Sequence, residues 1–387
     1  MASRLIMTVF FVQALAFGAW LPRIPDIQAR LGLSPAELGY ALLGLPVGLL
    51  IALPFVSIVV GRAGGRAAVL WSLPAFIVAI CPPAFAPDGI VLFLALALAG
   101  LAMSTIELGM NIVADETEKR DEVVIMSRCH GFWSLGMMVG SLTGAAAAHW
   151  GLAPQLSITA IAALALLVGP AIAMRLPRGP SGAGSPSGDT PVSGLFIPGA
   201  IMLGICIVAL AGNILEGAAA DWSAVYLRQV LGADPGAAGL GYAAYSLLMA
   251  VGRFNGDWVR SRWGAVVVAR SCYAVALVGL LLVVFAPDYP WALVGFALAG
   301  FGGSVGVPLA VSAAASAAGH TPAANVALVS LVSLVGFLLT PPIIGSVAEL
   351  FGLRAALGVL LLPVFVVAIA VAFTLARRRA APVVTAA

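Results

Sequence analysis

Long apolar stretches make up most of the chain, and short polar segments separate them. Twelve such stretches lie at 4–22, 38–60, 66–84, 89–112, 124–148, 153–174, 195–220, 237–256, 264–286, 291–315, 322–347 and 353–376. A helix needs about 20 predominantly apolar residues to cross the hydrocarbon core of a bilayer, and every stretch is close to that length. The pattern therefore predicts an all-α polytopic membrane protein with 12 transmembrane helices.

Short motifs recur in the second half of the chain at an almost constant offset. FAPD occurs at 85–88 and at 285–288, and ALAG followed by three residues and Ser occurs at 97–104 and at 297–304. A unit of six spans returns the chain to the side on which it began, so two copies must have the same orientation. We therefore expect two parallel six-helix repeats, related by an axis along the membrane normal.

The segment between the sixth and seventh stretches has the sequence PRGPSGAGSPSGDTPVSG. A segment so rich in Pro, Gly and Ser acts as a tether because it cannot bury a core. We expect an N-terminal six-helix bundle over 1–176, a cytoplasmic linker over 177–194 and a C-terminal six-helix bundle over 195–387.

The composition excludes a soluble protein. Hydrophobic residues occupy 62% of the 387 positions, and Asp, Glu, Lys and Arg together only 9%, whereas soluble domains carry about 25% charged residues. Twelve spans use roughly 240 residues, and the loops that remain are too short for a separate domain. We therefore expect no enzymatic activity, no resident cofactor, and a monomer embedded in the lipid bilayer.

The types of charged residue and of cysteine spacing further limit the classes of partner that the chain can bind. Lys119 is the one lysine beside eighteen arginines, and no basic run suits nucleic acid. The four cysteines occur singly, without the CxxC spacing of a metal site. We expect a small-molecule substrate as partner, with no nucleic acid and no metal ion. The polar stretch from Asp115 to Glu122 is expected to be a solvated loop.

The positive charges also predict the orientation. With both termini in the cytoplasm, fifteen Lys and Arg residues lie on the inner side, Arg253 among them, and four lie outside. Cytoplasmic loops carry such an excess. We therefore expect a multi-pass protein of the bacterial inner (plasma) membrane with cytoplasmic termini.

Twelve spans in two parallel repeats joined by a tether resemble the major facilitator superfamily (MFS) of secondary transporters, over essentially the whole chain. That family's signature is a loop G-x-x-x-D-R-x-G-R-R between spans 2 and 3, often repeated between spans 8 and 9. Here the second copy, at 252–264, keeps its acid, whereas the first, at 61–66, keeps only arginines. One explanation is that these arginines only determine the orientation of the chain in the membrane. The resemblance instead implies a conformational latch formed by Arg62, Arg66, Asp257, Arg260 and Arg262.

Three further elements are similar to a branch that holds the fucose–proton symporters and little-characterised YbjJ-like bacterial permeases. They are IELGMN at 106–111, SRCHGFWSLG at 127–136 and EGAAADWS at 216–223, in the order of that branch. Fucose-type symporters also have an acid in span 1, and none occurs from Ala16 to Leu21. Because span 1 lacks this acid, two questions stay open: whether the solute is a sugar, and whether two acidic residues couple its transport to protons.

Ionisable side chains inside the spans are candidates for function, because a charge within the bilayer is costly unless it is paired or solvated. Glu107 lies about 19 residues after Asp88, which is about 28 Å along a helix. Asn111 follows at i+4 on the same face. A carboxyl and an amide on one face suit a proton site or the hydroxyls of a polyol. The alternative is a structural carboxylate paired to another helix.

Glu216 occupies a comparable place in the seventh stretch, with Asn213 one turn earlier. By the symmetry of the repeats, the seventh span takes the position of the first. Glu216 is therefore a candidate counterpart for the acid that span 1 lacks. We expect Glu107 and Glu216 to face a central cavity and to couple transport to protons.

A second group is expected at a gate or in contact with the substrate. Trp222 corresponds roughly to Trp20, which predicts two facing aromatic rings; an interfacial aromatic belt is the alternative. Arg23 is a candidate to receive an anionic solute or to pair with Asp221, and His130 to pair with Glu107 or relay protons. The whole group is Trp20, Arg23, His130, Trp133, Asp221, Trp222 and Tyr226.

The resemblance and the intramembrane acids together favour a proton-coupled symporter of a small, sugar- or polyol-like solute, working by rocker-switch alternating access on the proton gradient. The main alternative is proton-driven efflux of drugs or amphipathic metabolites. Its span-5 signature, G-x8-G-x3-G-P-x2-G-G, is incomplete because Ala145, Ala147 and Ala148 replace its Pro and last two Gly. A third class, a transporter-derived sensor or scaffold, predicts no flux. No GxxxxGK[ST] segment supports ATP-driven transport.

Overall fold

The computed structural model describes residues 1–177, 198–317 and 320–380. Every regular element in these residues is helical, which confirms the all-α class. The linker expected over 177–194 lies outside the described residues except for its first position.

Twelve long helical segments follow one another in the described ranges. Those of the first half are α1 (Ala2–Gly18) continued by η1 (Leu21–Arg23) and α2 (Ile24–Leu31), α3 (Pro35–Leu42) continued by α4 (Gly44–Ala63), α5 (Gly65–Ala79) with η2 (Pro82–Phe85), α6 (Gly89–Asp121), α7 (Met126–His149) and α8 (Pro154–Ala173). Those of the second half are α9 (Ala200–Gln229), α10 (Pro235–Trp263), α11 (Ala265–Val284), α12 (Tyr289–Gly303) continued by α13 (Gly306–Ala315), α14 (Pro322–Phe351) and α15 (Leu353–Ala380). Each segment overlaps one predicted span.

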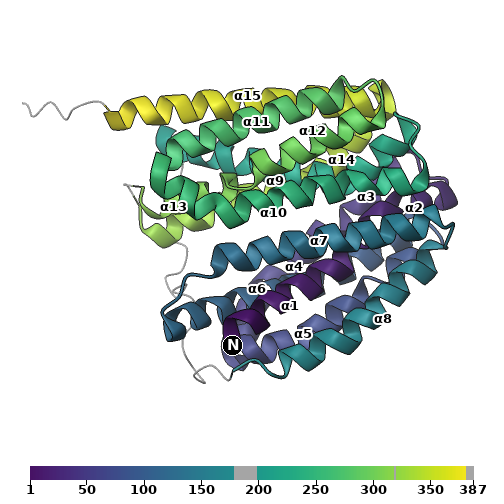
Figure 1. The fold of residues 1–387 in the computed structure, drawn as a ribbon, viewed down its shortest axis with the longest axis horizontal. Coiled ribbons are helices and arrows are strands. Elements are labelled where there is room, and N and C mark those ends of the chain that lie inside the picture. The colour runs from purple at the N-terminus through teal and green to yellow at the C-terminus, as the bar shows by residue number, and fades with distance from the viewer. Residues whose placement is uncertain (178–197, 318–319, 381–387) are drawn as a thin grey trace, which may run out of the picture.

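Ten of the described segments are long and apolar enough to cross a membrane. The other two, α7 and α10, lie side by side where the halves meet (Figure 1). Their lower hydropathy has a structural cause, because both carry polar side chains into the cavity described below. The chain is a multi-pass membrane protein whose two least apolar spans face each other inside the bundle.

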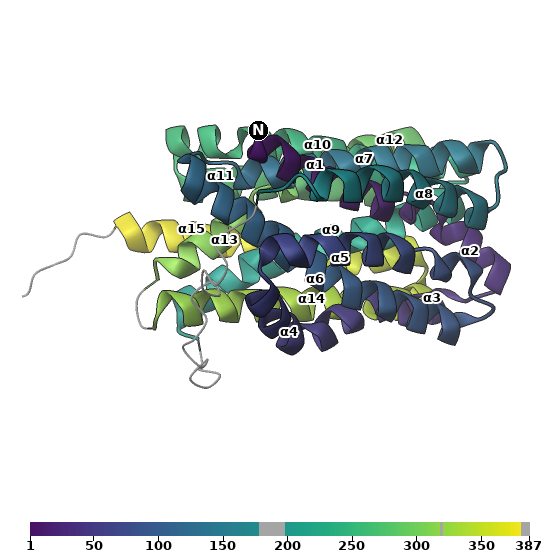
Figure 2. The same ribbon diagram turned by 90° about the horizontal axis from the view of Figure 1, so that it is seen from below.

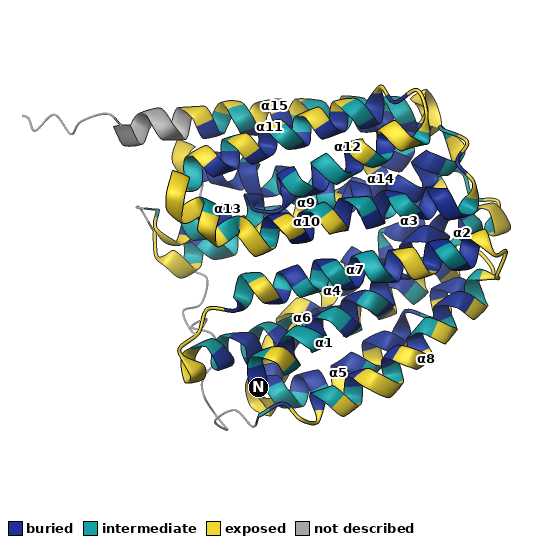
Figure 3. Cartoon of the chain, in the orientation of Figure 1, coloured by how far each residue is buried: buried dark blue, intermediate teal, exposed yellow. Residues whose placement is uncertain are grey.

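The helices form two groups, which Figures 1 and 2 show from two directions. α1 packs on α5, α6, α7 and α8, and α9 packs on α10, α12, α13, α14 and α15. The groups meet where α7 packs on α10 and where α3 packs on α14. Large apolar side chains are exposed on the periphery (Figure 3), including Phe55 of α4, Leu167 of α8 and Val359 of α15. Such a continuous apolar surface suits contact with lipid.

The duplication is visible in the backbone. Gly32 and Gly232 both have a φ of +64°, a left-handed conformation that glycine adopts without a Cβ clash. Asp88 and Asp288 both cap the helix that follows, by accepting a hydrogen bond from the backbone N–H three residues later. The same local structure thus recurs at the offset found in the sequence, as two parallel repeats require.

The expectation of a loop from Asp115 to Glu122 is wrong, because α6 continues to Asp121. Lys119 Nζ lies 2.7 Å from Asp115 Oδ2, one turn earlier, and ion pairs at i,i+4 support an exposed helix. The helix ends only at Glu122, where φ is +51°. Charged residues can therefore extend this span beyond its apolar part.

Candidate solute-binding cavity

A cavity of about 430 Å³ lies between the two halves. Residues of α1, α3, α4, α6 and α7 form one side of its wall, and residues of α9, α10, α13 and α14 form the other. All four residues expected to handle solute and protons line it: Glu107, Asn111, Asn213 and Glu216. Four of the expected gate or contact residues also line it: Trp20, His130, Trp133 and Asp221.

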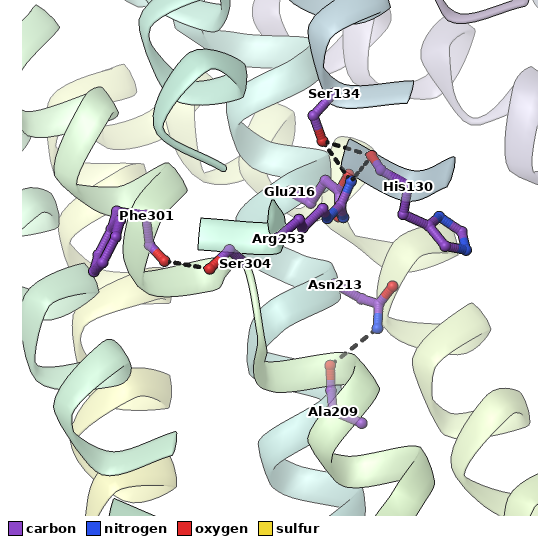
Figure 4. A network of polar contacts seen from close by, with 8 residues as sticks. All are labelled: His130, Ser134, Ala209, Asn213, Glu216, Arg253, Phe301 and Ser304. Carbon is purple, nitrogen blue, oxygen red and sulfur yellow. Dashed lines mark hydrogen bonds and ion pairs between the residues drawn. The ribbon is translucent and has the colours of Figure 1, made fainter. Parts of the chain in front are cut away.

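Arg253 of α10 is the centre of a polar network in the cavity (Figure 4). Its guanidinium donates to Ser134 Oγ at 2.7 Å and to the His130 carbonyl oxygen at 3.5 Å, both on α7. It also donates to Glu216 Oε2 of α9 at 3.5 Å and lies 5.6 Å from the centre of the Trp133 ring. Arg253 therefore neutralises Glu216 and connects the two halves.

The α9 face that meets the cavity explains why Asn213 and Glu216 lie together. Asn213, Glu216 and Ala220 follow at i, i+3 and i+7, a helical stripe that lines one wall. The Asn213 side-chain nitrogen donates to the Ala209 carbonyl oxygen at 3.0 Å (Figure 4). Its amide oxygen is left facing the cavity without a donor among the described residues.

Glu107, unlike Glu216, is not paired with a cation of the described residues. Asn111 donates to the Glu107 backbone carbonyl oxygen at 2.8 Å, not to its carboxyl group, and no side chain of the described ranges donates to that carboxyl. The expected pairing with His130 is not formed, since the imidazole packs edge-on against Phe10 at 5.5 Å between ring centres. Glu107 is thus a half-buried carboxyl group without a protein partner in the cavity wall.

Asp221 is a third cavity carboxyl group and also lacks a donor in the part of the chain that the structure describes. The expected partner, Arg23, is committed elsewhere: it lies 2.9 Å from Asp26 and donates to the Leu152 carbonyl oxygen at 2.6 Å. Arg23 does not line the cavity, so it is not placed to receive a solute in this conformation.

The prediction that Trp222 faces Trp20 across the cavity is wrong, since Trp222 is fully buried and does not line it. The true offset of 200 residues pairs Trp20 with Ala220, and both line the cavity. Trp222 lies two residues after Ala220, so its side chain is turned by about 200° around the helix relative to that of Ala220. Tyr226 is turned away as well, and donates to the Val283 carbonyl oxygen at 2.7 Å within the second half.

The expected latch contact between an acid and an arginine is not formed in this conformation. Within the described ranges Asp257 forms no ion pair, and Arg62 and Arg262 are exposed. Arg260 donates to Ser312 Oγ of α13 at 2.9 Å. Arg66 donates to the carbonyl oxygens of Leu176 and Met174, beyond the end of α8.

Sequence reasoning missed Arg253, which it counted with the inner loops. Arg253 precedes the end of α10 by ten residues, or about 15 Å of helix, and that depth was the available signal. It also missed Gln13, which is buried and accepts a hydrogen bond from Trp133 Nε1 at 2.9 Å. Gln13 stands 200 positions before Asn213, so the repeat would have indicated it.

The two halves are joined most closely at the end of the bundle that holds α2 and α3 (Figure 1). There Arg228 bonds to Asp26, and Gln229 donates to Gln28 at 2.9 Å. The Ala36 backbone N–H donates to Glu349 at 3.1 Å. At the opposite end, where α1 begins, the ribbons of the halves diverge (Figure 1). The cavity is thus sealed by polar contacts at one end.

Comparisons with known proteins agree with this architecture. A family model described as Major Facilitator Superfamily matches residues 6–325 and 201–387. An uncharacterised MFS-type transporter of Yersinia pestis is 32% identical over 93% of this chain and 92% of its own. An uncharacterised transporter of Sinorhizobium fredii is 32% identical over 92% of this chain and 96% of its own. A variant of the nucleoside transporter NupG has the same fold, with a TM-score of 0.75 at 13% identity over 97% of this chain and 99% of its own.

Proposed function

Because the chain belongs to the Major Facilitator Superfamily, we propose that this secondary transporter carries a small polar organic solute together with protons. The observation that carries the proposal is the cavity between the halves, in which no cation of the described residues binds Glu107 and Glu216 is bound to Arg253. A sugar- or polyol-like solute would meet amides and carboxyl groups there, and proton-coupled symport would use the two glutamates.

The proposed orientation puts both termini in the cytoplasm of a bacterium and the chain in its inner membrane. The excess of arginines on the side where α1 begins supports it. In that orientation the contacts of Asp26 with Arg228 close the outer end, and the cavity opens inward. Alternating access then requires these outer contacts to separate while the inner ends of the halves approach.

The proposed coupling uses the difference between the two glutamates. No cation of the described residues binds Glu107, whereas Glu216 is bound to Arg253. Protonation of Glu216 would release Arg253, and Arg253 holds α10 to α7 across the halves. Proton movement at Glu216 would therefore change a contact between the halves.

The proposed latch acts at the inner ends of the helices. Asp257, Arg260 and Arg262 lie near the end of α10, Arg62 lies in the last turn of α4, and Arg66 lies in the first turn of α5. In the outward-open state these groups would come together and replace the outer contacts. Asp257 is exposed in the present conformation and forms no ion pair with the residues that the structure describes, which supports that assignment.

The second candidate is proton-driven efflux of drugs or amphipathic metabolites. The observation that favours it is the aromatic and apolar part of the cavity wall, which includes Phe10, Phe17 and Phe337. Whole cells separate the two directions, because loss of an importer lowers the internal solute concentration and loss of an exporter raises it.

The test is solute-evoked proton movement in liposomes that contain the purified protein and an internal pH indicator. We expect at least one member of a panel of sugars, polyols and amino derivatives to change the internal pH. Glu107→Gln should abolish the response. Asp115→Asn, a matched change on an exposed part of the same helix, should preserve it. Solute flux without any proton movement would contradict the coupling, and the absence of any flux would favour a sensor or scaffold.

A further inference from the structure

The charges of the cavity wall do not balance. Among the described residues that line it, three carboxyl groups face one arginine. That arginine, Arg253, is bound to Glu216, so Glu107 and Asp221 are without a cation. Two arginines at the sealed end, Arg23 and Arg228, are not available either, since both bind Asp26. A carboxylate in such a place needs a proton or a cation that comes from outside the protein.

Asp221 lies apart from the proposed coupling pair. It follows Glu216 by five residues, which places it about 7.5 Å further along α9 toward the sealed end. Trp20 is the repeat counterpart of Ala220, so its ring enters the cavity at the same depth from the first half. Tyr242 of α10 completes this end of the wall. The sealed end of the cavity therefore combines one carboxylate with two aromatic rings.

Two amide groups of the wall present acceptors to the cavity. Asn111 and Asn213 each direct their side-chain nitrogen to a backbone carbonyl oxygen, so their amide oxygens are left for a ligand. Ser333 of α14, on the same side of the wall as Asn213, is only 9% exposed, and its hydroxyl has no partner within the described part of the chain. A buried hydroxyl without a partner is costly, and a ligand in the cavity would provide one.

We propose that the transported solute is a hydroxylated, sugar- or polyol-like molecule that carries a protonated amine, and that Asp221 binds this ammonium group between Trp20 and Tyr242. The inference rests on the proposed transport function and specifies its solute. A carboxylate supplies a charge-assisted hydrogen bond to an ammonium, and aromatic faces attract the same cation. The solute hydroxyls donate to the amide oxygens of Asn111 and Asn213. A neutral sugar would leave Asp221 without a counter-charge.

The test compares matched pairs that differ only in the amine. The purified protein in detergent is titrated with D-glucosamine, D-glucose and N-acetyl-D-glucosamine, and with amino-polyols beside their parent polyols, and the dissociation constants are measured by thermal shift and calorimetry. We expect an amine to bind at least tenfold more tightly than its neutral partner. Asp221→Asn should reduce that preference to less than twofold, and Asp115→Asn should leave it intact.

Several results would overturn the inference. They are equal binding within every pair, no binding by any amine, or a preference that survives Asp221→Asn. Sodium chloride provides a further arm: if Na⁺ alone gives the Asp221-dependent shift and amines do not, the carboxylate takes a metal cation. The wild-type comparison decides the matter even if Asp221→Asn does not fold. Because binding is measured without flux, neutral solutes that bind equally well leave the proposed transport function standing.

Discussion

Arg253 shows how one side chain can serve both stability and conformational change. Its side chain is 14% exposed and its partner Glu216 is 21% exposed. Removing one member of a buried charge pair leaves the other without compensation. Removing both leaves a neutral site, which costs much less. The single and double changes therefore give different results, and stability measurements can separate them.

We expect Arg253→Gln to lower the free energy of unfolding by about 2 kcal/mol, because Glu216 loses a charged hydrogen-bond donor. The double change Arg253→Gln with Glu216→Gln should recover most of that loss without restoring proton-driven transport. Thermal unfolding in detergent measures both, with the exposed Arg4→Gln as control. A single variant as stable as the wild-type protein would show that the pair has no structural role.

For single residues, the sequence identifies the acidic and amide side chains of the cavity better than it identifies the side chains that contact them. Glu107, Asn111, Asn213 and Glu216 were found because a polar residue inside an apolar stretch is conspicuous, and all of them line the cavity. The direction of a side chain around a helix is harder to predict. Trp222 was misplaced because a repeat aligned two positions out of register points a residue to the opposite side of its helix.

Close crossings of helices occur both within and between the halves. Gly48 of α4 meets the Ala97 carbonyl oxygen of α6 within the first half, and Gly345 of α14 meets the Pro35 carbonyl oxygen of α3 across the halves. A Cβ at Gly48 would lie 2.0 Å from its neighbouring oxygen, and one at Gly345 would lie 2.4 Å from its own. Small residues at such crossings allow backbones to approach in membranes. Only Gly345 belongs to a contact that alternating access must break.

The two glycines therefore predict different outcomes for the same substitution. Gly345→Ala should keep the sealed end from closing and shift the population toward the state open at that end. Gly48→Ala should lower stability by roughly 1–3 kcal/mol without that shift. The reactivity of a single cysteine at position 220 toward a membrane-impermeant reagent, added from the sealed end, reports the change. Equal reactivity in both variants and in the glycine-containing parent would contradict the assignment.

The end of a helix was predictable where it coincides with the end of an apolar stretch. It was less predictable where the helix continues through polar residues. The stretch from 195 to 220 identified α9, but the helix continues to Gln229 through Asp221 and Trp222. The first span is broken after Gly18 and continues through η1, where Pro22 lies, into α2. Hydropathy locates the apolar core of a span, whereas hydrogen bonding and packing set its ends.

The whole molecule exists in a conformation that is stabilised from one end. Asp26 forms an ion pair with Arg23 of its own half and accepts a hydrogen bond from Arg228 of the other half. The pair that crosses the halves, Arg228 with Asp26, is partly exposed at 32% and 17%, and ion pairs of this kind contribute about 0–1 kcal/mol. A contribution of that size is enough to change the ratio of two conformations severalfold.

We expect Asp26→Asn to increase the population open at the α2 and α3 end by about twofold to fivefold. Asp234→Asn is a suitable control, since Asp234 lies at the same end and its 3.8 Å contact with His149 is exposed. Pairs of spin labels across that end, measured by electron–electron double resonance, give the distance distribution. An unchanged distribution for Asp26→Asn would show that apolar packing alone closes this end.

The overall architecture was predictable because lipid restricts a chain to few solutions. Apolar stretches of about 20 residues cross the membrane as helices, and a six-helix repeat with even parity can only be parallel. The conformation was not predictable, because the contacts between Asp26 and Arg228 join residues 202 positions apart and depend on which end of the cavity is closed. Local pattern carries no information on that choice.

The most direct test of the account separates solute binding from proton coupling in Glu107→Gln. Liposomes containing this variant are loaded with the solute that evokes the strongest proton movement in the wild-type protein. Counterflow, the exchange of labelled for unlabelled solute, is then measured beside accumulation driven by a pH gradient. The account predicts that counterflow continues while accumulation is lost. Accumulation at the wild-type level would contradict the role given to Glu107.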